Sequence, residues 1–245
     1  MRLSLSDVSY LRDSIGVISE LVSEGRFSIT KNGVELVAMD PANVAMIIFR
    51  LLPSCFSEYN VDDPQVVGLN LSNLKQVLRR ASLGDSLSLE VFDGKLHITL
   101  DGASKRTFSL PIIAVDDREQ KVPSLSFPSS ITLPSSVLSN AIEDAGIVAE
   151  SVLFTVEPGF FTLSAEGDLS KASIQTREGD GIVILSDSKT RAKYAIEYLK
   201  KMVQGSKISD SVTVRIDTNY PLKLEYRSID KVSLEFILAP RVDDV

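Results

Sequence analysis

The sequence predicts an α+β protein of two similar halves, each an antiparallel sheet with two helices. Most of the 245 residues fall into short runs in which apolar and polar side chains alternate, as in half-exposed strands. Four segments change to helical spacing. The order strand, helix, several strands, helix, several strands occurs in residues 1–112 and again in residues 127–245. We therefore predict an internal duplication.

The strands are predicted by a period of two that is clearest at 87–91, 96–100, 212–216, 222–226 and 232–236. Tight turns separate several of these runs, at Asn32-Gly33, Asp93-Gly94, Asp101-Gly102 and Pro158-Gly159. Asn-Gly and Asp-Gly pairs favour hairpins because both residues accept a positive φ. The sequence is thus dominated by hairpin-linked strands.

The helices are predicted by apolar stripes. In chain order the stripes are Val8, Leu11, Ile15, Ile18 and Val22; Leu71, Leu74, Leu78 and Ala81, with Ser72 as the expected cap; Val137, Leu138, Ala141, Ile142 and Ala145; and Ala192, Ala195, Leu199, Met202 and Val203. Two helices per half cannot cover both faces of a sheet. One face of each half is then left to solvent or to a partner.

The two halves give the domain prediction: an N-terminal domain at 1–113, a linker at 114–127 and a C-terminal domain at 128–245. The linker region is rich in charge, contains proline and has no clear period, so we expect an exposed connector.

The charge of the chain is acidic overall but unevenly placed. With 26 basic and 33 acidic residues the net charge is −7, which argues against a protein that wraps DNA with its whole surface. The second helical segment nevertheless carries Lys75, Arg79 and Arg80. The fourth segment carries Lys189, Arg191, Lys193, Lys200 and Lys201 against Glu197. From charge alone, an ordinary solvated helix face and a phosphate-binding surface are both open interpretations.

Four stretches carry a resemblance to a known family. GVELVAMDPANVAMI (33–47), LNLSNLKQVLRRA (69–81), YPLKLEY (220–226) and EFILAPRVDDV (235–245) resemble segments of proliferating cell nuclear antigen, in the same order along the whole chain. The resemblance implies the DNA clamp fold, in which each domain has its sheet outside and two helices on the inner face. It also implies three subunits that close head to tail into a pseudo-sixfold ring.

The resemblance further implies which residues face DNA and which join subunits. The DNA-facing candidates are Arg12, Lys75, Arg79, Arg80, Lys189, Lys193, Lys200 and Lys201. The subunit contact is expected between edge strands at 104–110 and 171–177, with candidates Ser104, Arg106, Phe108, Leu110, Lys171, Ser173, Ile174 and Arg177. Pairing such edges is physically sensible, because an open edge strand is otherwise a liability.

A pocket for partner peptides is implied as well. Its expected members are Met39, Val44, Met46, Val122, Ala195, Pro221, Ile237, Leu238, Ala239 and Pro240. For Met46 ordinary core packing is the favoured interpretation. A Gln and hydrophobic anchors of the partner would bind here, and the final segment would pair with the peptide backbone. We expect Ile237→Asp with Leu238→Asp to abolish this binding without disturbing the ring.

The partners that the resemblance implies are duplex DNA, two further clamp subunits, a clamp loader, DNA polymerase, flap endonuclease and DNA ligase. The sequence departs from the family where relatives carry basic residues, at Asn140, Glu143 and Glu197. These departures leave a homotrimer and a heterotrimer open. A checkpoint-type clamp subunit is the alternative within the same structural class.

The residue inventory argues against catalysis. His97 is the only histidine and Cys55 the only cysteine, so histidine-based metal sites and Ser-His-Asp chemistry lack parts. Carboxylate pairs occur at Asp62-Asp63, Asp116-Asp117 and Asp243-Asp244, and a carboxylate metal nuclease is the remaining enzymatic hypothesis. We expect no catalytic residue, metal or cofactor.

The apolar runs are too short to cross a membrane, and the first residues do not resemble a secretory signal. We therefore expect an intracellular protein, in the cytoplasm or nucleoid, or in the nucleus if the source is eukaryotic.

Overall fold

The computed structural model describes residues 1–115 and 120–241. The chain divides into two compact units. The first contains Met1–Pro41, Ile47–Val122 and Ser228–Leu234, and the second contains Ala42–Met46, Pro123–Arg227 and Glu235–Val245. The proposed domain boundaries at 113 and 128 stay a prediction.

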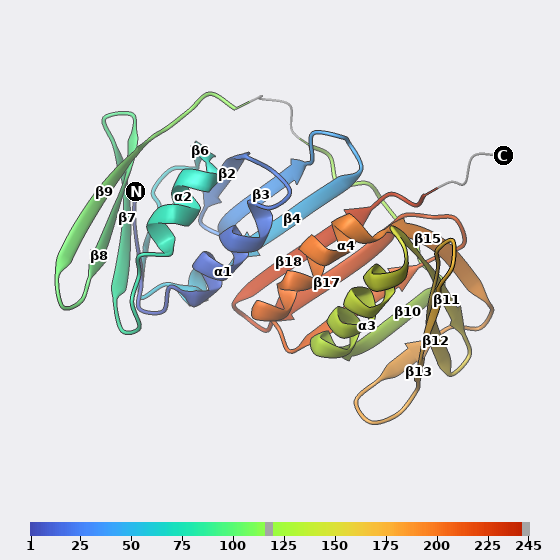
Figure 1. Cartoon of the computed structure of the whole chain (residues 1–245). Helices are drawn as coiled ribbons and strands as arrows, with labels where there is room; N and C mark the ends of the chain where they lie inside the picture. Colours follow the sequence, from blue (N-terminus) through green and yellow to red (C-terminus); the bar gives the residue numbers. More distant parts are fainter. Residues whose placement is uncertain (116–119, 242–245) are drawn as a thin grey trace. The chain divides into compact units, whose positions relative to one another are not determined.

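The first unit contains two groups of antiparallel strands (Figure 1). One has the order β5-β1-β7-β8-β9, with β1 (Arg2–Leu5), β5 (Glu58–Asn60), β7 (Ser86–Phe92), β8 (Lys95–Asp101) and β9 (Lys105–Pro111). The other has the order β4-β3-β2-β6, with β2 (Glu24–Thr30), β3 (Gly33–Met39), β4 (Ala45–Leu51) and β6 (Gln65–Asn70). The helices are α1 (Ser9–Ile18), α2 (Leu71–Leu78) and the short η1 (Pro53–Cys55).

The second unit repeats this plan. One group of strands has the order β14-β10-β16-β17-β18, with β10 (Ser129–Pro134), β14 (Val183–Leu185), β16 (Ser211–Ile216), β17 (Leu222–Ser228) and β18 (Val232–Leu238). The other has the order β13-β12-β11-β15, with β11 (Ser151–Glu157), β12 (Phe160–Glu166), β13 (Lys171–Arg177) and β15 (Thr190–Ala195). The helices are α3 (Ser135–Val148), α4 (Ile196–Met202) and η2 (Val203–Lys207).

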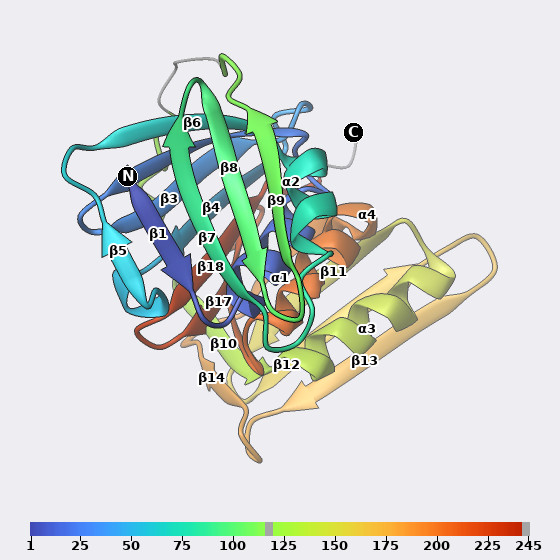
Figure 2. The same cartoon turned by 90° about the vertical axis from the view of Figure 1, so that its left-hand side faces the viewer.

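The strand orders confirm the predicted α+β fold with two similar halves. β9 of the first half corresponds to β18 of the second, and β4 corresponds to β13. Within each half the two helices contact each other, α1 with α2 and α3 with α4 (Figures 1 and 2). The duplication makes it possible to compare equivalent positions of the halves one by one.

The helices cover one face of the sheets, as the second unit shows. α3 contacts β11, β12 and β13. The side chains of Val152, Phe154 and Val156 on β11 are fully buried, while Leu153 and Thr155 between them are half-buried on the other face. Phe154 packs edge-on against Tyr194, with ring centroids 5.3 Å apart. Strand alternation therefore separates a core face from an outward face.

The predicted cap of the second helix is wrong by two residues. The side chain of Asn70, not that of Ser72, accepts a hydrogen bond from the backbone N–H of Asn73 at 2.9 Å. Asn70 ends β6 in extended backbone, and this geometry suits an N-cap.

The fourth predicted helix begins too early. Ala192 and Lys193 belong to β15, and α4 begins only at Ile196. Thr190, Ala192 and Tyr194 are buried and alternate with Arg191 and Lys193, which is strand spacing. Lys189, Arg191 and Lys193 therefore do not share a helix face with Lys200.

No helix within the described parts of the chain is long and apolar enough to cross a membrane.

Candidate functional site

The helix surface of the second unit carries paired rather than isolated charges. The Nζ atom of Lys200 on α4 lies 3.3 Å from a carboxylate oxygen of Glu143 on α3. Lys201 pairs with Glu197 one helical turn earlier, also at 3.3 Å. Asn140 and Asp144 are exposed on α3. The uneven charge predicted for this surface is thus present, and acidic side chains partly neutralise its cations.

The helix surface of the first unit keeps more of its positive charge. Lys75 forms an ion pair with Glu20, and the Nε atom of Arg12 lies 2.9 Å from Asp13. Arg79 and Arg80 are exposed at the C-terminal end of α2, and no ion pair to either side chain is found among residues 1–115 and 120–241. Cations at a helix C-terminus are favoured by the helix dipole. This end of α2 is the clearest phosphate-binding candidate on the helix surfaces.

Two predicted DNA-facing residues lie elsewhere. Lys193 points away from the buried face of β15, so it is on the sheet face opposite α3. Lys189 precedes β15 and pairs with Glu157 at 3.0 Å. Because both were assigned to the inner surface through a helix that does not reach them, we withdraw Lys189 and Lys193 from that set.

The predicted subunit-contact segments are open edge strands. β9 ends the order β5-β1-β7-β8-β9, and β13 ends the order β13-β12-β11-β15. Each lies beside a helix, β9 next to α2 and β13 next to α3 (Figure 2). An edge strand presents a row of unpaired backbone groups to a further strand.

Side chains along β9 and β13 fit such a role. Phe108 and Leu110 pair in register with buried Ile98 and Leu96, so they lie on the core face, yet they are only half-buried at the edge. Ile174 on β13 has the same position opposite Leu163. A further strand at either edge would cover these side chains.

Two members of the predicted contact already have interactions within the chain. Arg106 pairs with the buried carboxylate of Asp85 and donates from Nη1 to the carbonyl of Arg80 at 2.8 Å, which ties β9 to the segment after α2. The guanidinium of Arg177 lies 5.4 Å from the centre of the Phe160 ring. Ser104, Lys171 and Ser173 are exposed.

Several predicted pocket residues converge in the second unit. The N–H of Ala239 donates to the carbonyl of Val44 at 2.9 Å, and the N–H of Arg241 donates to the carbonyl of Lys193 at 2.7 Å. These bonds bring Pro240 beside the end of β15, where Ala195 lies. The N–H of Asn219 bonds to the carbonyl of Arg191 at 3.1 Å and so holds the loop before Pro221 next to the same strand.

Three predicted pocket residues are core residues. Met46, Ile237 and Leu238 are 5, 7 and 0% exposed. For Met46 this agrees with the favoured interpretation. An Asp at Leu238 would put a charge into the core, so the expectation that Ile237→Asp with Leu238→Asp leaves the ring intact does not hold. Met39 and Val122 belong to the first unit, and their role stays a prediction.

The residues considered for catalysis are in unreactive surroundings. The thiol of Cys55 donates to the carbonyl of Lys231 at 3.2 Å, and burial raises its pKa, which disfavours the thiolate. His97 lies on the outward face as predicted but is half-buried, stacked on Phe92 with centroids 3.7 Å apart and 2.9 Å from the hydroxyl of Ser109.

Asp62 and Asp63 are exposed, whereas the pairs at 116–117 and 243–244 lie outside the described residues. Among the described residues no three His, Cys, Asp or Glu side chains gather as a metal site would require.

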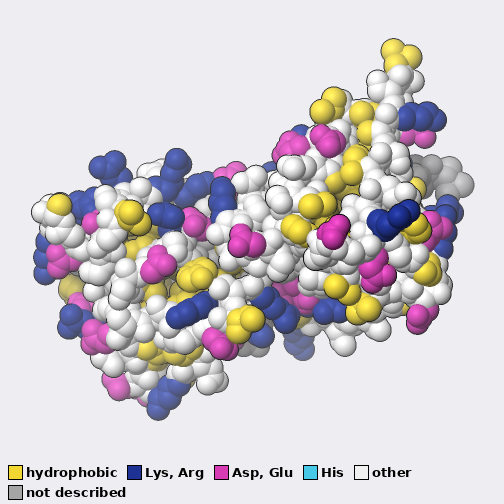
Figure 3. Space-filling model, turned by 90° about the horizontal axis from the view of Figure 1, so that it is seen from below, with side chains coloured by type: hydrophobic (Ala, Val, Ile, Leu, Met, Phe, Trp, Pro, Cys, Tyr) yellow, Lys and Arg dark blue, Asp and Glu magenta, His cyan; other side chains and the backbone are white. Residues whose placement is uncertain are grey.

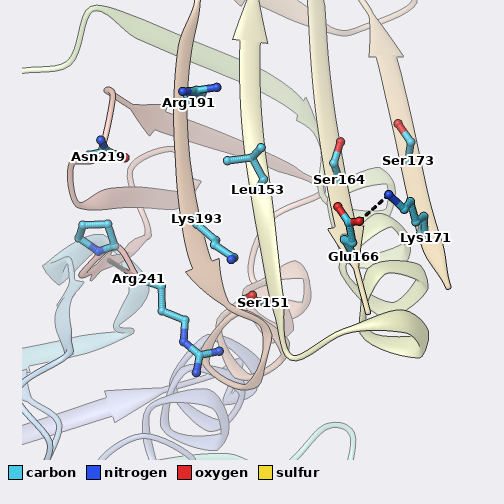
Figure 4. A pocket seen from close by; sticks show the side chains of 13 residues that line it. Ser151, Leu153, Ser164, Glu166, Lys171, Ser173, Arg191, Lys193, Asn219 and Arg241 are labelled. Atoms are coloured by element: carbon cyan, nitrogen blue, oxygen red, sulfur yellow. Dashed lines mark ion pairs between the residues drawn. The ribbon is translucent and has the colours of Figure 1, made fainter. Parts of the chain in front are cut away.

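One feature of the second unit escaped the sequence prediction: a cavity on the outward face of β11, β12, β13 and β15 (Figure 4). Arg191, Lys193 and Arg241 are among its lining residues. The signal was the two-residue spacing of Arg191 and Lys193, which puts both on one face of a strand.

Charges of both signs are mixed on another part of the surface. Figure 3 shows a face of the molecule on which Lys and Arg side chains are intermingled with Asp and Glu.

Comparison with protein families gives two matches that together span almost the whole chain. Residues 1–117 match the model of the proliferating cell nuclear antigen N-terminal domain, and residues 121–241 match that of the C-terminal domain.

Among curated proteins, a DNA polymerase sliding clamp of Thermococcus gammatolerans is 40% identical over 235 residues, 95% of this chain and 94% of the relative. A DNA polymerase sliding clamp of Nanoarchaeum equitans is 34% identical over 99% of this chain and all of the relative.

Solved structures agree. PCNA from Thermococcus kodakaraensis superposes with a TM-score of 0.92 at 25% identity, over 98% of this chain and 99% of that one. A chain of a PCNA2–PCNA3 complex from Sulfolobus tokodaii gives 0.90 at 28% identity, with the same coverage.

Proposed function

This chain belongs to the proliferating cell nuclear antigen family and is a subunit of a DNA polymerase sliding clamp, and from this premise we propose how it assembles, meets DNA and binds partners. The observation that carries the proposal is the pair of open edges. Within the described residues, β9 and β13 each end their sheet and have a strand on one side only. If β9 of one subunit pairs with β13 of the next, every subunit pairs its β9 with one neighbour and its β13 with the other. Such heterologous contacts close into a ring.

DNA would pass along the helix side of this ring. Arg79 and Arg80 are the principal contacts, assisted by Arg12, Lys75, Lys200 and Lys201. Contacts of this kind reach phosphates and read no base edges, so they are independent of sequence and weaken with salt. Because four of the six cations are paired with carboxylates, the attraction is weak enough for sliding. Retention on DNA then comes from the closed ring.

Partner proteins would bind at the end of β15 and the C-terminal segment. Val44, Ala195, Pro221, Ala239 and Pro240 are half-buried there and surround the backbone bonds of Ala239 and Arg241. Both amides are already bonded, so an incoming peptide would use other backbone groups. DNA polymerase, flap endonuclease, DNA ligase and the clamp loader are the partners that the family implies. The chain itself acts as a tether and catalyses no reaction.

This peptide site is tested with Pro221→Asp/Pro240→Asp, which places charge at two half-buried loop positions. We expect a polymerase-derived peptide with a Gln and hydrophobic anchors to bind about tenfold or more weakly, since its apolar anchors would meet charge. The control is Pro64→Asp/Pro158→Asp, at two exposed prolines. Equal binding by the two variants would remove the site from the proposal.

Subunit composition is tested by native mass measurement of the purified chain. The uneven helix surfaces permit either composition, and we propose a homotrimer in which acidic substitutions are tolerated. A stable self-trimer supports this. A chain that remains monomeric alone but joins sister subunits would show a heterotrimer instead.

A further inference from the structure

The cavity on the outward face of the second unit is large, and most of its charged lining residues are cationic. It has a volume of about 810 Å³ and lies over β11, β12, β13 and β15, and Arg241 is among the residues that line it (Figure 4). Its charged lining residues are Arg191, Lys193, Lys171 and Arg241, against the single carboxylate of Glu166. A surface of this charge stands out in a chain whose net charge is −7.

The cations reach the cavity from different elements. Arg191 and Lys193 lie two residues apart on β15 and therefore share its outward face. The bond from the Arg241 N–H to the Lys193 carbonyl brings Arg241 beside β15. Across the cavity Lys171 pairs with Glu166, and this pair, assisted by the charge of Lys193, lowers the pKa of Glu166. Glu166 thus stays ionised and is compensated by Lys171.

The duplication shows what occupies the equivalent place in the first unit. Gly68 stands two residues before the end of β6, as Lys193 stands two residues before the end of β15, and the register with the neighbouring strand is the same. The N–H of Ile113 donates to the carbonyl of Gly68 at 3.0 Å, just as Arg241 donates to Lys193. Ile113 in the first unit therefore corresponds to Arg241 in the second.

In the first unit this segment continues over the outward sheet face. Val115, Gln120 and Lys121 line a cavity with Val37 and Met39 of β3. Its volume is about 390 Å³, roughly half that of the second unit's cavity, and its charged residues are balanced: Glu24, Glu35, Arg26 and Lys121. The backbone approaches closely, since a Cβ at Gly68 would lie 2.2 Å from the carbonyl oxygen of Ile113. Residues that follow Ile113 thus lie against this face of the first unit, close to a glycine where the second unit has Lys193.

In the second unit no segment within residues 120–241 covers the corresponding face. We propose that this face binds an extended acidic segment of a partner protein, laid over β15, β11 and β12 as the linker is laid over the first unit. The excess of three cations selects carboxylate-rich sequences. This goes beyond the apolar peptide site, because the ligand is recognised by charge and needs no Gln or hydrophobic anchor.

The test measures binding of fluorescein-labelled decaglutamate to the full chain by fluorescence anisotropy at low salt. Arg191→Glu/Lys193→Glu is expected to weaken binding about tenfold or more, since two attractive charges become repulsive. Lys31→Glu/Lys95→Glu makes the same charge change at exposed positions of the first unit and is expected to alter binding less than about twofold. Binding should also weaken steeply with added salt.

Four outcomes would overturn the proposal. The first is that decaglutamate binds the wild type no better than decaglycine. The second is that both double variants lose binding equally, which would make net charge the cause. The third is a ten-nucleotide oligothymidylate that responds to Arg191→Glu/Lys193→Glu while decaglutamate does not, which would identify a nucleic-acid site. The fourth is decaglutamate binding that Asp243→Asn/Asp244→Asn tightens more than Asp62→Asn/Asp63→Asn does, which would identify the chain's own acidic residues as the occupant. The polymerase-derived peptide binds through the apolar anchors that decaglutamate lacks, so its binding, measured alongside, reports on the apolar site separately.

Discussion

The ammonium of Lys200 on α4 lies 3.3 Å from the carboxylate of Glu143 on α3, so an acidic helix neutralises a cation of the proposed DNA surface. Both side chains are about half exposed, and such a pair contributes only about 0–1 kcal/mol to stability. Its main effect is therefore to lower the positive charge of the surface that we propose contacts DNA.

Glu143→Gln should strengthen the hold on DNA. The variant releases Lys200 and removes one negative charge, so single-molecule tracking on DNA is expected to show the loaded clamp diffusing about two- to fivefold more slowly at low salt. Asp62→Asn, which removes one charge from an exposed turn, is the control. No difference between the two variants would mean that Lys200 does not approach phosphate.

Arg79→Gln/Arg80→Gln should have the opposite effect. The two exposed arginines at the end of α2 are expected to account for up to about two released counterions, so the loaded clamp diffuses faster along DNA and the salt dependence of its diffusion becomes shallower. Lys31→Gln/Lys95→Gln is the matched control. An unchanged salt dependence in the arginine variant would place the DNA contacts elsewhere.

Phe108→Asp should leave a folded but monomeric chain. Phe108 is half-buried on the open edge strand β9, and a charge there opposes the addition of a further strand. Phe92→Asp is the control, because Phe92 is 56% exposed on β7 of the same sheet. Light scattering that shows an intact trimer for Phe108→Asp would contradict the proposed ring contact.

A ladder of ion pairs on the second unit makes stability depend on pH. Glu235 lies 2.8 Å from Lys223 and 2.9 Å from Arg227. Burial alone would raise the pKa of Glu235, but the hydrogen bonds and charges of these two cations outweigh burial, and the pKa lies below its ordinary value of 4.5. The ion pair therefore stabilises fully above about pH 4.5, and the stabilisation is lost as the pH falls through the lower pKa of the folded state.

Glu235→Gln should therefore destabilise the chain by about 1–3 kcal/mol at pH 7, because a largely buried charge-assisted bond is lost. Near pH 3 the difference from the wild type should shrink. Urea unfolding at fixed protein concentration measures both values. A difference that is the same at the two pH values would show that Glu235 acts through packing alone.

The fold was largely predictable because its patterns are local. The period-two runs and the repeated order of elements are properties of neighbouring residues, and the structure repeats that order strand by strand. The boundary between β15 and α4 was not predictable in this way. Ala192 and Ala195 fit a helical stripe with Leu199, while Thr190, Ala192 and Tyr194 fit a strand, and alanine does not distinguish the two.

The site was less predictable because it depends on pairing over long distances in sequence. The edge position of β9 and β13 follows from the sheet order, and no local pattern reveals that order. The same holds for Lys200 and Glu143, which are 57 residues apart, and for the bond that brings Arg241 beside Lys193. The resemblance to a clamp family indicated the edges, but the cationic cavity appeared only in the structure.

The central claim, a ring subunit that retains a polymerase on DNA, is tested most directly by primer extension with the cognate polymerase and clamp loader. On primed circular DNA the chain should lengthen the products of a single binding event, and on linear DNA with open ends this effect should disappear because the ring slides off. Products of the same length with and without the chain on the circular template, or an equal effect on both templates, would contradict the account.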